Sequence, residues 1–170
     1  AAVPVPWIFI ALVALLRLAE LIHARRNTAR LMARGGIEHG RGHYPVIVAL
    51  HAGWLTALAV LVPPDTPVQW PWLALFIGLQ GVRVWVIASL GPYWTTRVIT
   101  LPGAPLVRRG PYRFLRHPNY CVVAAEIAVL PLAFGAWHIA LGFSILNALV
   151  LAWRIQVEQA ALAPRTAATE

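Results

Sequence analysis

The sequence predicts an all-α integral membrane protein, a helical bundle with about five transmembrane helices. Two observations support this fold class. Hydrophobic residues make up 59% of the 170-residue chain and charged residues only 12%, whereas soluble domains carry roughly 45–50% apolar and about 25% charged residues. The apolar residues also fall in long stretches that are separated by arginine-rich segments. This composition excludes an ordinary soluble domain and a disordered chain.

Five apolar stretches have, or nearly have, the roughly 20 residues that a helix needs to cross the hydrocarbon core. They cover residues 5–23, 44–62, 70–90, 119–134 and 136 to about 157. The fourth stretch is the weakest, because Pro118 suits a helix start and Pro131 should kink or end the helix. With a tight turn at Gly135, the last two stretches form a helical hairpin. Whether the fourth span reaches the far surface is left open.

The arginines predict the orientation of these spans. All 14 basic residues are arginine, and five fall in each of the segments 25–43 and 91–117, which we expect to be loops. The N-terminus, the turn at 63–69 and the turn at Gly135 hold none. By the positive-inside rule, this alternation requires an odd number of spans and places the N-terminus outside and the C-terminus in the cytoplasm. The tryptophans that then fall at the outer edge are Trp7, Trp70, Trp72 and Trp137.

The net charge of +8 would usually suggest nucleic-acid binding. Here the arginines lie in two separate segments beside apolar spans, so topology and contact with anionic membrane lipids explain them, and no nucleic-acid partner is expected. A single cysteine, Cys121, excludes an intrachain disulfide. The histidines lack the spacing of metal ligands, so no metal site is expected.

Six ionisable residues fall within the spans or at their ends: Arg17, Glu20, Arg83, Glu126, Arg154 and Glu158. A charge at the centre of the bilayer costs roughly 2.5–3.5 kcal/mol on insertion scales, so these residues should face the protein interior and pair. We expect structural salt bridges for Arg17 with Glu20 and for Arg83. Arg154 and Glu158 lie one helical turn apart near the second arginine-rich segment, which favours a functional role.

The most informative segment, residues 110–120, has the sequence Gly-Pro-Tyr-Arg-Phe-Leu-Arg-His-Pro-Asn-Tyr. Pro118 leaves His117 at the N-terminal end of a helix, where unpaired backbone N–H groups favour a carboxylate or another anion. Arg116 adds a cation, and Tyr112 and Tyr120 add aromatic faces. A small ligand with a carboxylate, a cation and a flat ring would suit such a site.

This segment, followed by an apolar hairpin and then Arg154-Ile-Gln-Val-Glu158, resembles the isoprenylcysteine carboxyl methyltransferase family. Its wider relatives are the membrane phospholipid methyltransferases. The family pattern is G-x-Y-x-x-x-R-H-P-x-Y, then a helical hairpin, then R-x-x-x-E-E. This chain departs from it at Gln159, which replaces the second acid. We expect one methyltransferase domain over residues 1–170, with three spans in 1–90 and the family-like part in 91–163.

The resemblance implies S-adenosylmethionine as the methyl donor, bound on the cytoplasmic side, with S-adenosylhomocysteine as the product. It implies a cofactor loop that contains Tyr112, Arg116, His117, Pro118 and Tyr120. Glu158 would complete the cofactor pocket, and Arg154 would orient the acceptor. Arg154 and Glu158 are thus the expected catalytic residues, while Arg83 and Glu126 either line an acceptor tunnel or lock helices together.

The acceptor in such proteins is lipophilic and enters from the bilayer. An ionised carboxylate or enolate is already a nucleophile, so alignment supplies much of the catalysis, whereas a phenol or enol would need a base such as Glu158 or His117. The arginine-only composition suggests a bacterial inner-membrane protein. We therefore expect O-methylation of a molecule such as a long-chain alkylpyrone or alkylresorcinol, with an isoprenylcysteine-like carboxylate as the second possibility.

Three other functions compete with this interpretation. A phospholipid or amine N-methyltransferase would use the same cofactor. The NADPH-dependent sterol reductases share a similar C-terminal membrane architecture, although this chain lacks the length for their additional spans. A membrane scaffold without catalytic activity would bind neither cofactor.

Overall fold

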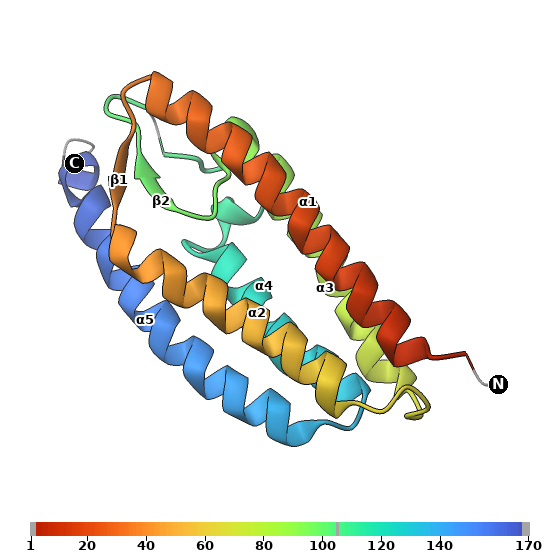
Figure 1. Ribbon diagram of the computed structural model, residues 1–170. Helices are drawn as coiled ribbons and strands as arrows, with labels where there is room; N and C mark the ends of the chain where they lie inside the picture. Colours follow the sequence, from red (N-terminus) through yellow and green to blue (C-terminus); the bar gives the residue numbers. More distant parts are fainter. Residues whose placement is uncertain (1–2, 105, 168–170) are drawn as a thin grey trace.

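The described residues, 3–104 and 106–167 of a computed structural model, form five α-helices that run along one bundle (Figure 1). The helices are α1 (Val5–Ala33), α2 (Tyr44–Leu61), α3 (Trp70–Leu90), α4 (Pro118–Ala133) and α5 (Trp137–Ala167). The start of α1 and the end of α5 lie at opposite ends of the bundle, as an odd number of spans requires. The predicted all-α fold is confirmed.

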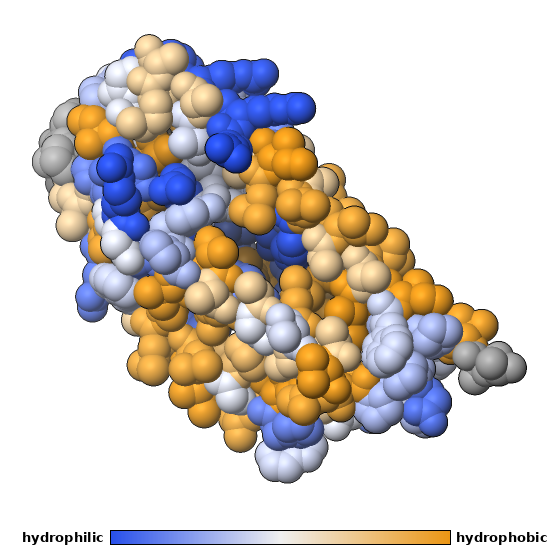
Figure 2. All heavy atoms as spheres, in the orientation of Figure 1, coloured by the Kyte–Doolittle hydropathy of each residue, from blue (hydrophilic) through white to orange (hydrophobic). Residues whose placement is uncertain are grey.

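Four of the helical segments are long and apolar enough to cross a membrane: Val5–Ala33, Arg41–Leu61, Trp70–Tyr93 and Trp137–Ala161. Hydrophobic side chains cover most of the length of the bundle, and hydrophilic ones gather at its ends (Figure 2). The chain is therefore an integral membrane protein. The fourth helix, α4, is shorter, because its 16 residues span about 24 Å against a hydrocarbon core of about 30 Å. Gly135, with a φ of 68°, makes the expected turn into α5.

The segment 25–43, which we expected to be a loop, continues α1 as far as Ala33. The reason is that arginine has a high helix propensity and that Ala24, Asn27 and Leu31 recur on one buried face of the helix. The Asn27 amide also donates hydrogen bonds to the Gly91 and Trp94 carbonyl oxygens, at 3.1 and 2.9 Å. α1 therefore extends past the hydrocarbon and contacts the segment that follows α3.

A two-stranded antiparallel ribbon, which the sequence analysis did not anticipate, joins the two arginine-rich segments. Strand β1 (Ile37–His39) pairs with β2 (Val98–Thr100), with Glu38 opposite Ile99. The His39 ring lies 2.9 Å from the Thr100 hydroxyl. The ribbon is covered on one side by α5 and lies at the end of the bundle where α1 and α5 reach furthest (Figure 1).

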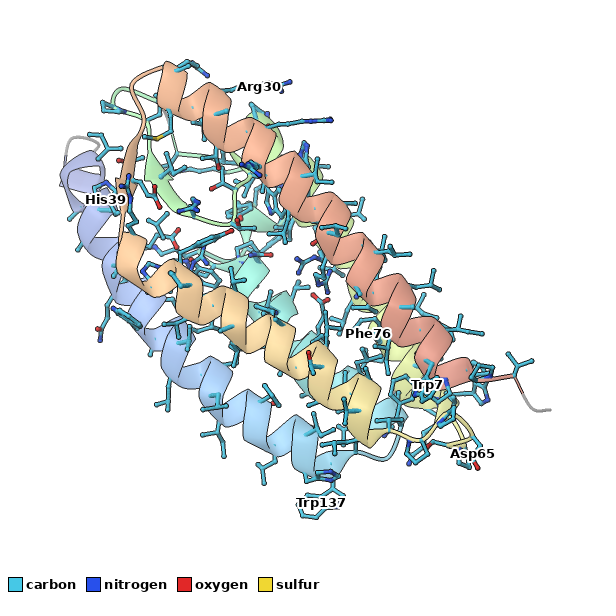
Figure 3. All side chains as sticks on the ribbon, in the orientation of Figure 1. Trp7, Arg30, His39, Asp65, Phe76 and Trp137 are labelled. Atoms are coloured by element: carbon cyan, nitrogen blue, oxygen red, sulfur yellow. The ribbon has the colours of Figure 1, made fainter. Side chains whose placement is uncertain are left out.

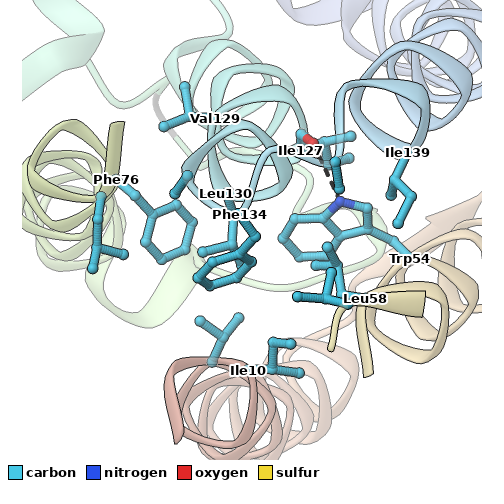
Figure 4. Close-up of a cluster of buried hydrophobic side chains, with 14 residues drawn as sticks. Ile10, Trp54, Leu58, Phe76, Ile127, Val129, Leu130, Phe134 and Ile139 are labelled. Carbon is cyan, nitrogen blue, oxygen red and sulfur yellow. Dashed lines mark hydrogen bonds between the residues drawn. The ribbon is translucent and has the colours of Figure 1, made fainter. Parts of the chain in front are cut away.

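The hydrophobic core fills the opposite half of the bundle. Trp54 from α2 packs among Leu58, Ile127 and Leu130, all almost completely buried (Figure 4). The Trp54 indole N–H donates to the Ile127 carbonyl oxygen at 3.2 Å, which joins α2 to α4. Because this half is tightly packed, space for a ligand is found at the end that carries the ribbon.

Candidate functional site

A cavity of about 1090 Å³ opens at the ribbon end of the bundle. In Figure 3 this end is marked by Arg30 and His39, and the opposite end by Trp7 and Trp137. The wall of the cavity is formed by β2, by the 3-10 helices η2 (Gly91–Tyr93) and η3 (Gly110–Arg113), and by the adjoining ends of α4 and α5. The predicted site residues that line it are Tyr112, Arg116, His117, Tyr120, Arg154 and Glu158. Pro118 is buried at the start of α4, next to His117.

A chain of hydrogen bonds on the cavity wall links α4, α5 and the segment after η2. The Tyr120 hydroxyl donates to the Glu158 carboxylate. The Arg154 guanidinium donates to the Tyr120 oxygen at 3.0 Å and to the Thr96 carbonyl oxygen at 2.6 Å. Arg154 is buried, whereas 27% of the Glu158 side chain is exposed. Glu158 is therefore held in place and still accessible to a ligand.

His117 lies beside this chain. Its ring stacks on the Tyr120 ring at a centroid distance of 5.2 Å, and its Nδ1 is 3.9 Å from the Glu158 carboxylate. That distance is too long for a hydrogen bond. The His117 Nε2, the Asn119 Oδ1 and the Trp94 indole nitrogen are buried with no hydrogen-bond partner among the described residues. Three cavity-lining residues thus carry unsatisfied polar atoms, which points to a ligand as their missing partner.

The loop that carries Tyr112 is held against α3. Gly110 has a φ of 60°, and a Cβ atom at this position would lie 2.0 Å from the Ser89 Oγ. Arg109 donates to the Ser89 carbonyl oxygen at 2.6 Å. Burial raises the pKa of the Tyr112 phenol above its usual range, and the Glu158 carboxylate raises it further. Tyr112 therefore stays a neutral hydrogen-bond donor.

The sequence analysis missed residues that line the cavity or lie beside it. Arg97 donates to Glu38 at 2.7 Å, and its guanidinium lies 3.9 Å from the centre of the Tyr44 ring. The Tyr44 hydroxyl is 3.0 Å from the Thr96 Oγ1. Asn119 lies within the motif and could have been noticed there, but Thr96 acts through its backbone carbonyl and has no signal in the sequence.

The cavity is strongly cationic. Among the described residues, five arginines and one carboxylate, that of Glu158, line it. The five are Arg97, Arg108, Arg113, Arg116 and Arg154. Since Arg97 is already paired with Glu38, four arginines remain against one acid. An excess of this size favours a ligand with an acidic group.

Arg83 and Glu126 lie elsewhere, in a cluster of charges that joins α1, α3 and α4. Arg83 donates to both Glu20 oxygens at 2.9 Å and to Glu126 at 3.2 Å. Arg17 pairs with Glu20 at 3.1 Å and with Glu126. The expected salt bridges are confirmed, and neither Arg83 nor Glu126 lines the large cavity. A separate hollow of about 10 Å³ borders both residues, so their role beside an acceptor tunnel stays a prediction.

Comparison with known proteins agrees with the motif. The model of the isoprenylcysteine carboxyl methyltransferase (ICMT) family matches residues 72–164. An uncharacterized protein of Bacillus subtilis, YpbQ, is 40% identical over 161 residues, which is 92% of this chain and 95% of that protein. An uncharacterized protein of Haemophilus influenzae is 26% identical over 152 residues, which is 86% of this chain and 88% of that protein.

No solved structure matches the chain with significance. The family model covers more than half of the sequence, including the loop with Tyr112, His117 and Tyr120, the hairpin, and the turn of α5 with Arg154 and Glu158. This chain therefore belongs to the isoprenylcysteine carboxyl methyltransferase family and is a membrane methyltransferase.

Proposed function

We propose that the protein is an S-adenosylmethionine-dependent O-methyltransferase that acts at the membrane on a lipophilic acceptor. One observation carries this proposal. The hydrogen-bonded chain of Arg154, Tyr120 and Glu158 places a cation and a carboxylate side by side on the wall of a large cavity. Such a pair can bind a cationic methyl donor on one side and an acidic acceptor on the other.

The residues present fit S-adenosylmethionine. Glu158 offers a carboxylate to a cationic group, and Arg116 with the start of α4 offers a binding site for a carboxylate. His117 and Asn119 have buried polar atoms in need of partners, and Tyr112 offers an O–H donor. When bound, the cofactor would supply an electrophilic methyl group attached to a sulfonium sulfur. The cavity exceeds the roughly 300–1,000 Å³ of single-ligand pockets, which leaves room for an acceptor.

The excess of arginine supports oxygen rather than nitrogen as the methylated atom. Arg154 would hold an acidic oxygen in the ionised form, which is the nucleophilic form. The chain then needs no strong base, and its contribution is to align the two reactants, which is worth up to roughly 7–11 kcal/mol in well-oriented systems. A neutral amine, which is the nucleophilic form of nitrogen, has no charge for these arginines to stabilise.

A lipophilic acceptor is supported by the setting of the cavity. The helices around it expose apolar faces along most of their length (Figure 2), so a molecule dissolved in the bilayer lies next to the site. Candidate acceptors are long-chain alkylpyrones, alkylresorcinols and isoprenylcysteine-like carboxylates. We place the cofactor side of the protein in the cytoplasm of a bacterial inner membrane, with the N-terminus outside, because the arginines gather on that side.

Two measurements on the purified protein in detergent test this proposal. Calorimetry should give heat on titration with S-adenosylhomocysteine and none with NADPH. Heat with NADPH alone would indicate a reductase. No heat with either compound would indicate a scaffold without catalytic activity. Transfer of a labelled methyl group should then be measured for the candidate acceptors, for phosphatidylethanolamine and for short water-soluble acids. Rapid methylation of the short acids alone would overturn the lipophilic acceptor, and methylation of the amine alone would overturn O-methylation.

A further inference from the structure

Two large apolar side chains are exposed in the loop between η3 and α4. Phe114 is 75% exposed and Leu115 is 51% exposed. Arg113 and Arg116, which flank them, are exposed as well. All four residues line the large cavity. Contiguous exposed apolar surface outside a membrane span can mark a contact with a protein or a membrane.

Two contacts fix the position of this loop along the bundle, one at each of its ends. The Gln69 backbone N–H donates to the Ala133 carbonyl oxygen at 2.8 Å, so α3 begins where α4 ends. From that level α4 rises about 22 Å to Pro118, and α3 rises about 28 Å to Ser89. The backbone of Gly110 packs directly against Ser89. The loop is therefore tethered about 22 to 28 Å along the bundle from the start of α3, a length close to the roughly 30 Å thickness of a hydrocarbon core.

From these distances we infer that the segment from Arg113 to Arg116 is a membrane anchor. Phe114 and Leu115 insert into the interfacial region of the leaflet on the arginine-rich side of the protein. Arg113 binds the phosphate groups of anionic phospholipids in that leaflet, while Arg116 remains available to the cofactor. The inference concerns contact with the membrane and is independent of the reaction that the site catalyses.

The charges of the loop identify the lipid. Neither Arg113 nor Arg116 forms an ion pair with any carboxylate in the part of the chain that the structure describes. The Arg113 guanidinium lies 5.7 Å from the centre of the Phe114 ring, so cation and apolar ring face the same region. Arginines next to interfacial apolar residues favour anionic over zwitterionic headgroups. The anchor would keep this side of the large cavity next to the leaflet.

Spin labelling of the full-length protein in lipid nanodiscs tests the inference. Cys121, the single cysteine, is replaced by serine, and a nitroxide is attached to Phe114→Cys. Matched labels at Ala33→Cys, on the part of α1 beyond the hydrocarbon, and at Ile77→Cys, on an exposed face near the middle of α3, give the aqueous and membrane limits. Accessibility to oxygen and to a water-soluble nickel complex then reports the depth of each label. Circular dichroism confirms that every labelled variant is folded, and Leu115→Cys provides a second label position.

The Phe114 label should give an oxygen-to-nickel accessibility ratio between those of the two control labels. The ratio should rise when phosphatidylglycerol replaces part of the phosphatidylcholine, and Arg113→Gln should abolish that rise. A Phe114 label that is as accessible to nickel as the label at Ala33 would overturn the anchor. If added S-adenosylhomocysteine then lowered the nickel accessibility of this label, the loop would be a cover over the cofactor and not a membrane anchor. An intermediate ratio that is equal in both lipids would overturn the role of Arg113.

Discussion

The Arg154 guanidinium donates a hydrogen bond to the Tyr120 hydroxyl oxygen at 3.0 Å, and this hydroxyl donates its own proton to Glu158. Tyr120 thus separates a cation from an anion that could otherwise pair directly. The arrangement keeps the Glu158 carboxylate on the cavity side and the Arg154 guanidinium against the Thr96 carbonyl oxygen. Its consequences can be tested one residue at a time.

Replacing Tyr120 by phenylalanine removes the hydroxyl and keeps the ring that stacks on His117. Hydrogen bonds to charged groups contribute about 1.5–3 kcal/mol, so kcat/KM for methyl transfer should fall roughly 10- to 150-fold. Steady-state kinetics provide the measurement. Tyr93→Phe is the matched control, because this hydroxyl belongs to the same cavity and has no hydrogen bond to Arg154 or Glu158. Equal losses in both variants would contradict the role of Tyr120.

Glu158→Ala and His117→Ala should each weaken S-adenosylhomocysteine binding in calorimetry. The loss of affinity should be larger for Glu158→Ala, because a charged partner is removed, and it should be at least tenfold.

Arg154→Ala should lower turnover more than cofactor affinity, since Arg154 faces the acceptor in our proposal. Gln159→Glu, which introduces the second acid of the family pattern, is expected to retain binding. Unchanged cofactor affinity in both alanine variants at Glu158 and His117 would refute the assignment.

The raised pKa of Tyr112 predicts how binding depends on pH. An ordinary tyrosine ionises near pH 10, whereas burial and the Glu158 carboxylate keep Tyr112 protonated beyond that value. The affinities of the wild type and of Tyr112→Phe for S-adenosylhomocysteine should therefore run parallel between pH 7 and about pH 10. Calorimetry over this range provides the test. Loss of affinity near pH 10 in the wild type alone would show that the phenol ionises normally.

Glu126→Leu should destabilise the bundle strongly. Its carboxylate is 2% exposed and pairs with Arg17 and Arg83, and removal of one partner from a buried ion pair costs about 3–5 kcal/mol. Thermal unfolding in detergent should show a large fall in Tm. Asp65→Asn, a change at an exposed turn, serves as the control. The double variant Arg17→Leu/Glu126→Leu should recover part of the loss, and a further loss of equal size would contradict the pairing.

Gly110→Ala tests the loop that carries the site. The new Cβ atom would collide with the Ser89 Oγ, and the positive φ adds strain of about 1–3 kcal/mol. The loop should shift, and S-adenosylhomocysteine affinity should fall more than tenfold. Gly142→Ala, where a Cβ atom meets nothing within 4 Å, should retain affinity. Ser89→Ala combined with Gly110→Ala should restore part of the binding, and a neutral Gly110→Ala would show that the loop is not fixed there.

The sequence was sufficient for features that depend on composition and local pattern. Apolar stretches placed the five helices, and the cost of charges in the bilayer predicted that Arg17, Glu20 and Arg83 pair. The spacing of Arg154 and Glu158 along one helix also predicted that they share a face, and in the structure both line the cavity. These features need no knowledge of distant contacts.

Features that depend on contacts between distant segments were not predictable. Each strand of the ribbon has three residues, too few for a periodic signal, and their partners are about 60 residues away in the chain. The continuation of α1 to Ala33 depends on the burial of Asn27 against the Gly91 and Trp94 carbonyls. When charge alone is considered, five arginines after an apolar stretch favour a loop. In the structure the segment stays helical, because the other face of α1 packs against the rest of the protein.

The ribbon has a mechanical consequence for the cavity. Its strand β2 forms part of the cavity wall, and β1 follows the end of α1 after three residues. Gly36, in this short connection, lies against the Leu31 carbonyl and the Ile99 side chain, with no space for a Cβ atom. Any displacement of the end of α1 would therefore reach the wall beside Thr100 through a short, closely packed connection.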